Sequence, residues 1–176
     1  RYGIKLWLYS NEPEGFYSAD DPLLKAHPEL AGAGWSSRRY VCPNSEASQT
    51  FITESTRWIS SQVQGLGGMI NISLGEHGSS CLDQVGAEAD RRPNCPRCSL
   101  VPNWQTLAAS QAAMARGLKE GDPNAEYICW LYMPAWKPLA PWVYELGAHM
   151  PKDVTLQVNF ESGALKYQLD RPRIGG

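Results

Sequence analysis

Long apolar runs are missing from this 176-residue sequence, and so is a surplus of charge of either sign. Its apolar stretches fall far short of the ~20 residues that a membrane-spanning helix needs. The 16 lysines and arginines stand against 18 aspartates and glutamates, which gives a net charge of −2 and argues against a nucleic-acid-binding surface. We therefore expect neither a membrane nor a nucleic acid as a partner.

Two motifs of common enzyme classes are also missing. No Gly-x-Gly-x-x-Gly follows an expected strand, so a dinucleotide site has no support, and no Gly-x-Ser-x-Gly elbow indicates a serine hydrolase. What is present is the composition of an ordinary folded domain, with 43% hydrophobic and 19% charged residues. The chain is long enough to bury a hydrophobic core.

Short apolar segments predict strands, and amphipathic segments between them predict helices. Strands are expected at residues 3–9, 69–74, 126–132 and 154–160, and helices at 45–64, 103–121 and 139–149. The segment up to residue 44 is expected to be a long irregular loop after the first strand. Such alternation of strand and helix is typical of parallel α/β proteins with right-handed crossovers.

The connections differ in length in a way that favours a TIM barrel. Those after strands are long and carry the unusual residues, whereas those before strands are short, as in a barrel whose active face lies at the carboxyl ends of its strands. Four strands cannot close a barrel of eight, which usually takes ~250 residues. We predict that residues 1–176 form a single, incomplete segment of a TIM-barrel catalytic domain, with about four βα units. The abrupt ends at Arg1 and Gly176 lead us to expect the remainder of the barrel in a longer chain.

Glu76 is the strongest candidate for catalysis because it follows an expected central strand directly. A carboxyl group between a buried face and solvent can have a raised pKa, which the general acid of glycosidic bond cleavage requires. Most glycosidases use a second carboxylate, and Glu161 and Glu12 lie at matching strand ends, with Asp83 as a weaker choice. Each of these acids is otherwise a solvated loop residue.

Aromatic residues crowd the end of the third expected strand. Trp130, Tyr132 and Trp136 carry flat rings that stack on sugar rings, although core packing is the alternative role for such residues. His77 adjoins Glu76 and is the histidine that we place at a site. The residues predicted to contact a carbohydrate substrate are Asn11, Glu12, His77, Trp130, Tyr132 and Trp136.

Four of the five cysteines form a candidate metal site. Cys95-Pro-Arg-Cys98 has the spacing of a zinc knuckle, Cys81 lies in the same loop, and Cys42 lies in the preceding connection. We expect a structural zinc ion held by these four, or by three of them with His77. A disulfide pair or free thiols are the alternatives. Cys129, within a strand, is predicted to be a small buried apolar residue.

The order of these motifs resembles the middle of bacterial TIM-barrel glycoside hydrolases. The resemblance is carried by residues 2–13, 27–32 and 65–76 and by the Cys95-Pro-Arg-Cys98 loop. The groups in question are related to family 20 β-N-acetylhexosaminidases and to α-glucuronidases. The resemblance implies that Glu76 is the general acid/base after the fourth barrel strand. Family 20 enzymes have an Asp directly before that Glu, whereas this chain has Gly75, which argues against substrate-assisted cleavage of N-acetylhexosaminides.

Two functions of other classes also fit the sequence. One is a non-catalytic carbohydrate-binding or scaffold domain in which the zinc loop is structural. The other is a metal-dependent hydrolase that uses His77 and the cysteines, which would require an open coordination position on the metal.

Overall fold

A four-stranded parallel sheet forms the centre of the protein. The computed structural model describes residues 3–11, 18–75, 78, 80–85, 90–132, 140–158, 165–168 and 170–174. The strands of this sheet are β1 (Trp7–Asn11), β4 (Gly68–Ser73), β5 (Glu126–Leu131) and β6 (Val154–Val158). They lie side by side in that order, and every neighbouring pair is parallel. The expected mixed α/β fold with a parallel sheet is therefore confirmed.

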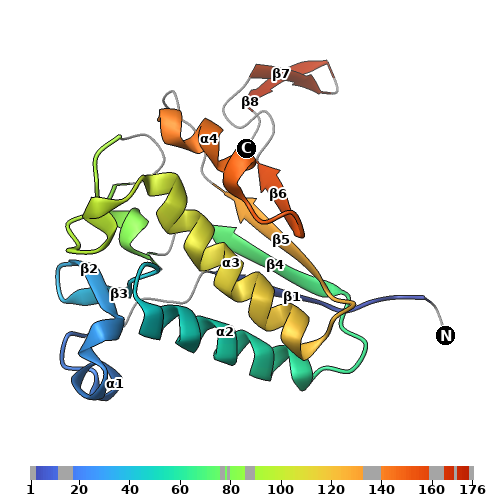
Figure 1. Cartoon of the computed structure of the whole chain (residues 1–176). Helices are drawn as coiled ribbons and strands as arrows, with labels where there is room; N and C mark the ends of the chain where they lie inside the picture. The colour runs from blue at the N-terminus through green and yellow to red at the C-terminus, as the bar shows by residue number, and fades with distance from the viewer. Residues whose placement is uncertain are drawn as a thin grey trace.

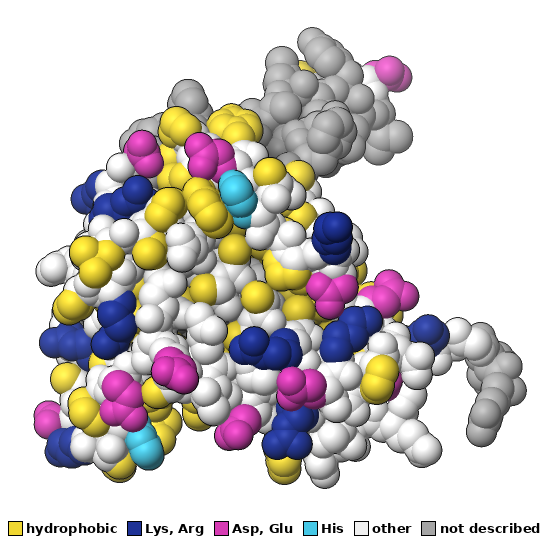
Figure 2. All heavy atoms as spheres, viewed as in Figure 1, with side chains coloured by type: hydrophobic (Ala, Val, Ile, Leu, Met, Phe, Trp, Pro, Cys, Tyr) yellow, Lys and Arg dark blue, Asp and Glu magenta, His cyan; other side chains and the backbone are white. Residues whose placement is uncertain are grey.

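Three helices connect these strands: α2 (Glu46–Ser61), α3 (Asn103–Gly121) and α4 (Pro141–His149). Figure 1 shows α2 and α3 lying next to each other along the same face of the sheet. The two helices come this close because Gly117 has no side chain, since a Cβ there would lie 2.2 Å from the carbonyl oxygen of Thr53. Over this helical face, basic and acidic side chains are interspersed (Figure 2), as the balanced composition predicts.

The core lies between the sheet and these helices. Along β5, Tyr127, Cys129 and Leu131 are buried, whereas the side chains between them are partly exposed. The buried set packs towards α3 and α4, so Ile128 and Trp130 belong to the opposite face of the sheet. The prediction that Cys129 is buried is thus confirmed.

A buried polar network fixes α3 on the sheet. The hydroxyl of Tyr127 donates to Oε1 of Gln111 at 2.6 Å, and Nε2 of Gln111 donates to the Ser73 hydroxyl at 2.9 Å. On β1, the Ser10 hydroxyl donates to the Asn71 side chain at 2.9 Å. Because buried polar groups are costly unless they are paired, these bonds specify one register between helix and strands.

The expectation of an irregular loop up to residue 44 is wrong. This segment contains α1 (Pro22–Ala26), a 3-10 turn η1 (Pro28–Leu30), and an antiparallel hairpin of β2 (Ala31–Trp35) and β3 (Arg38–Val41). The first strand is also shifted, since β1 begins at Trp7 rather than at residue 3. The Ala-Gly-Ala-Gly start of β2 has no apolar alternation, and its contacts, described below, come from distant cysteines.

Four further elements complete the described chain. Two 3-10 turns, η2 (Cys81–Gln84) and η3 (Cys98–Leu100), lie between β4 and α3. A second antiparallel pair, β7 (Leu165–Gln168) and β8 (Arg171–Ile174), lies near the carboxyl terminus. Within the described ranges, we find no helix that combines the length and apolarity required to traverse a bilayer.

Candidate metal centre

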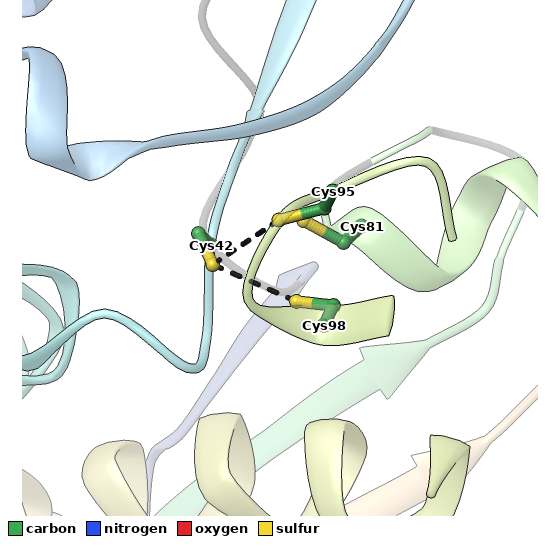
Figure 3. Close-up of side chains that lie close together, drawn as sticks. All are labelled: Cys42, Cys81, Cys95 and Cys98. Carbon is green, nitrogen blue, oxygen red and sulfur yellow. Dashed lines mark hydrogen bonds between the residues drawn. The ribbon is translucent and has the colours of Figure 1, made fainter. Parts of the chain in front are cut away.

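Four cysteines from three separate segments meet beside the hairpin. Cys42 directly follows β3, Cys81 begins η2, and Cys95 and Cys98 lie in the loop before α3. Their side chains are at most 2% exposed, and their four sulfur atoms all lie within 4.8 Å of one another. Figure 3 shows the four side chains converging from these segments. The chain thus places four potential metal ligands around one point.

The sulfur spacing fits a single four-coordinate ion. Cys42 Sγ lies 3.6 Å from Cys95 Sγ and 3.5 Å from Cys98 Sγ. A disulfide requires a sulfur–sulfur distance of about 2.05 Å, so these cysteines are thiols. Zinc–sulfur bonds of about 2.3 Å in a tetrahedron place neighbouring sulfurs about 3.8 Å apart. The four cysteines can therefore hold a metal ion.

Nitrogen donors surround the sulfur atoms. Nε of Arg97 donates to Cys42 Sγ at 3.1 Å, and the backbone N–H of Ala33 donates to Cys81 Sγ at 3.2 Å. The side-chain amide of Asn44 donates to Cys98 Sγ at 3.3 Å. Such N–H groups favour a sulfur that carries negative charge, which is the form that binds metals. This outer shell is thus suited to thiolates.

The four thiols shift one another's pKa values through the contacts between their sulfurs. The hydrogen bond from Cys81 is the main cause that lowers the pKa of Cys42 to about 6, and Arg97 lowers it further. The hydrogen bond with Cys42 lowers the pKa of Cys95 and raises those of Cys81 and Cys98. Four thiolates so close together require a cation among them.

Gly32 makes room for this cluster. A Cβ on Gly32 would lie 2.2 Å from Cys81 Sγ, closer than real atoms approach, and 3.0 Å from Cys42 Cβ, which is a tight contact. Strand β2 therefore runs directly against the sulfurs, and Ala33, which is 2% exposed, packs with the four cysteines in one buried cluster. The glycine at this position explains why the hairpin lies here.

Gln84 connects η2, which carries Cys81, with the hairpin and with the loop that carries Cys95. Its side-chain amide donates to the carbonyl oxygen of Gly34 in β2, and its Oε1 accepts the backbone N–H of Asn94 at 2.8 Å. Asn44 similarly donates to the Thr106 hydroxyl at 2.9 Å and so links the centre to α3. Neither residue is expected from the sequence, because no local pattern marks a side chain that bridges distant loops.

Predicted sugar-binding residues meet at the carboxyl end of the sheet. Trp130 contacts Tyr132 edge-to-face with ring centroids 5.1 Å apart, and contacts Tyr9 of β1 at 6.4 Å. We call Tyr9, Trp130 and Tyr132 the aromatic row. Asn11 and Tyr132 flank Gly75, since a Cβ at Gly75 would lie 3.9 Å from Asn11 Oδ1 and from Tyr132 Cδ1. The structure thus brings Asn11, Trp130 and Tyr132 together on one side of the sheet end.

The remaining candidate residues have different outcomes. Asp83 accepts the backbone N–H of Ser80 at 2.6 Å in a capping box, so this weaker carboxylate candidate caps η2. The other predicted catalytic and substrate-binding residues lie outside the described residues and stay predictions: Glu12, Glu76, His77, Trp136 and Glu161. The fourfold cluster is complete without His77.

The resemblance to glycoside hydrolases rests on the order of motifs in the sequence and stays a prediction. The structure itself shows a parallel α/β fold and a cluster of four cysteines. Comparison with protein family models, with curated proteins and with solved structures finds no match to this chain.

Proposed function

We propose that this chain is part of a TIM-barrel glycoside hydrolase in which four cysteines hold a structural zinc ion. The observation that carries the proposal is the arrangement at the carboxyl end of the parallel sheet. There Trp130 and Tyr132 of the aromatic row lie near Asn11, and the cysteine cluster ties together the connections that follow β1 and β4. Carboxyl ends of parallel strands are where barrel enzymes bind their substrates.

The donor set supports zinc in a structural role. Four cysteine sulfurs are soft ligands, and tetrahedral S₄ sites are typical of zinc or iron. Buried cysteines that fill all four positions leave no place for water or substrate, which catalytic zinc sites keep open. This argues against the metal-dependent hydrolase that uses His77. When bound, zinc would hold Cys42, Cys81, Cys95 and Cys98 as thiolates and fix the loops that carry them.

The sheet supports a partial barrel. Its four strands are parallel and follow one another in sequence order, as neighbouring strands of a barrel do. In a barrel, the face without helices points inward, and this is the face that carries Trp130 and Tyr9. We assign the four strands to the middle of an eight-stranded barrel whose other strands come from the rest of a longer chain.

Glu76 is the proposed proton donor, because in sequence it stands three residues after Ser73, the last residue of β4. Its carboxylic acid would protonate the glycosidic oxygen of the leaving sugar. A second carboxylate, for which Glu161 and Glu12 are the candidates, would act as base or nucleophile. The aromatic row would stack on a sugar ring, and Asn11 would hydrogen-bond a hydroxyl.

Replacing Glu76 by glutamine tests the hydrolase. In the full-length protein, Glu76→Gln is expected to lower kcat on a responsive aryl glycoside by about 100-fold, because glutamine cannot donate the proton. Initial rates on a panel of aryl glycosides measure this effect. The zinc content of the variant should equal that of the wild type. A lower rate then reflects the loss of the acid and not the loss of the metal. Unchanged rates on every hydrolysed substrate would refute the role of Glu76.

Replacing Trp130 tests carbohydrate binding independently of catalysis. Trp130→Ala is expected to weaken oligosaccharide binding by about 5-fold, since a lost stacking contact is worth about 1 kcal/mol. Isothermal titration calorimetry measures it, and Trp58→Ala on the exposed side of α2 is the matched control. Equal affinities of both variants would contradict a sugar site at the aromatic row. Selective loss of binding in a protein that hydrolyses no glycoside would instead favour the non-catalytic carbohydrate-binding domain.

A further inference from the structure

Arg97, within the Cys95-Pro-Arg-Cys98 loop, bridges two parts of the metal centre. Its Nε donates to Cys42 Sγ at 3.1 Å, and its terminal nitrogen donates to the carbonyl oxygen of Ala31 at 2.5 Å. Ala31 opens β2, the strand whose Ala33 N–H bonds Cys81 Sγ. One guanidinium therefore contacts a ligand sulfur directly and, through Ala31, holds the strand that contacts another.

The charge of the centre gives Arg97 a second role. Four thiolates around a divalent ion carry a net charge of −2, and the cysteines that bear it are buried. Burying net charge is costly unless nearby groups compensate it. Of the donors described above, the Ala33 backbone and the Asn44 amide are neutral, whereas Arg97 carries a full positive charge.

We propose that Arg97 is an outer-sphere determinant of this metal site, which sets the metal affinity and the electron density on the Cys42 sulfur. The inference rests on the proposed metal centre and goes beyond its structural role. The guanidinium N–H lowers the electron density on the Cys42 thiolate. Together with its positive charge, this reduces the cost of burying the anionic complex. Outer-sphere hydrogen bonds of this kind tune both affinity and reduction potential.

Two measurements on purified protein test this role. Arg97→Ala should bind zinc 10–100-fold more weakly in competition with a chromophoric chelator. With iron in the site, its Fe³⁺/Fe²⁺ potential should shift to more negative values, because a lost positive charge and N–H favour the ferric form. A merely structural loss of packing would not shift the potential of the folded, iron-loaded protein. Arg57→Ala, on the exposed side of α2, is the matched control and should behave as the wild type.

Arg97→Lys provides a second, more conservative variant. Lysine keeps the charge but lacks the planar fork that reaches both Cys42 and Ala31, so its zinc affinity should lie between wild type and Arg97→Ala. A wild-type protein that binds no metal would refute the proposed centre itself. The inference about Arg97 alone would be overturned by a different result. In that case the wild type binds one zinc ion, and Arg97→Ala has a zinc affinity within twofold of the wild type and the same iron potential. If Arg97→Ala does not fold, a zinc affinity of Arg97→Lys equal to that of the wild type would overturn the inference.

Discussion

Cys42→Ser is expected to abolish tight zinc binding, reducing the metal content from about one ion per chain to less than about one tenth after dialysis. Cys42 is fully buried, and its sulfur contacts those of Cys95 and Cys98. A serine hydroxyl does not ionise near neutral pH and is a poor zinc ligand. The free energy of unfolding should fall by more than about 4 kcal/mol, as for the loss of a structural metal. Elemental mass spectrometry and guanidinium unfolding measure the two effects.

The fifth cysteine provides the control for this variant. Cys129 is as buried as Cys42 but lies in β5, where its sulfur is 3.7 Å from the Ser73 hydroxyl. Cys129→Ala removes a buried sulfur without touching the cluster, so it should retain one zinc ion. Zinc retained by Cys42→Ser at wild-type affinity, or lost equally by both variants, would contradict the assigned ligand set.

Gly32→Ala is expected to weaken zinc binding about as strongly as the loss of one ligand, although it changes no cysteine. The added Cβ would lie 2.2 Å from Cys81 Sγ, so sulfur or strand must move by more than 1 Å. Zinc–sulfur distances deviate from their usual value by only about 0.2 Å. The displaced ligand should lower zinc affinity by about 1000-fold or more, and overpacking should cost a further 1–3 kcal/mol of stability. Chelator competition and chemical unfolding, with and without zinc, measure these changes.

Gly147→Ala is the matched control for Gly32→Ala. Gly147 lies in α4, and a Cβ there meets no atom within 4 Å. Alanine should leave zinc affinity unchanged and increase stability by about 0.8–1 kcal/mol through helix propensity. Wild-type zinc affinity in Gly32→Ala would mean that β2 does not pack against the metal site as described.

Much of the sheet and its helices follows from local sequence signals. The strand and helix from residue 45 to 74 are predicted by their periodicity, but α2 ends at Ser61 rather than at residue 64, and Gly65, at φ +74°, lies in the turn that follows. Alternation along β5 likewise places Trp130 and Tyr132 on the same face. These features depend on residues close in the chain, so the sequence alone is sufficient to find them.

The hairpin and the outer shell could not be found this way. Strand β2 is mostly alanine and glycine, and it packs against Cys81, Cys95 and Cys98, which are distant in sequence. The sequence identifies the four cysteines but leaves zinc, disulfide and free thiol as alternatives. The sulfur distances exclude the disulfide and show that the four sulfurs are close enough to share one metal ion. Gln84 and Asn44 bridge loops without any local pattern, so tertiary structure alone reveals them.

The chain positions of the cysteines also determine when during folding a metal can be fully bound. Cys42 precedes α2, whereas the other three ligands follow β4, and 53 residues separate Cys42 from Cys95. Closing a loop of that length costs about 3.5 kcal/mol in chain entropy. Pairing of β1 with β4 across α2 shortens the distance to be closed. The three cysteines that follow β4 could bind zinc first, and the gain of Cys42 as the fourth ligand would report the formation of the first parallel crossover. With cobalt in place of zinc, the absorption change during refolding would therefore report when β1 pairs with β4.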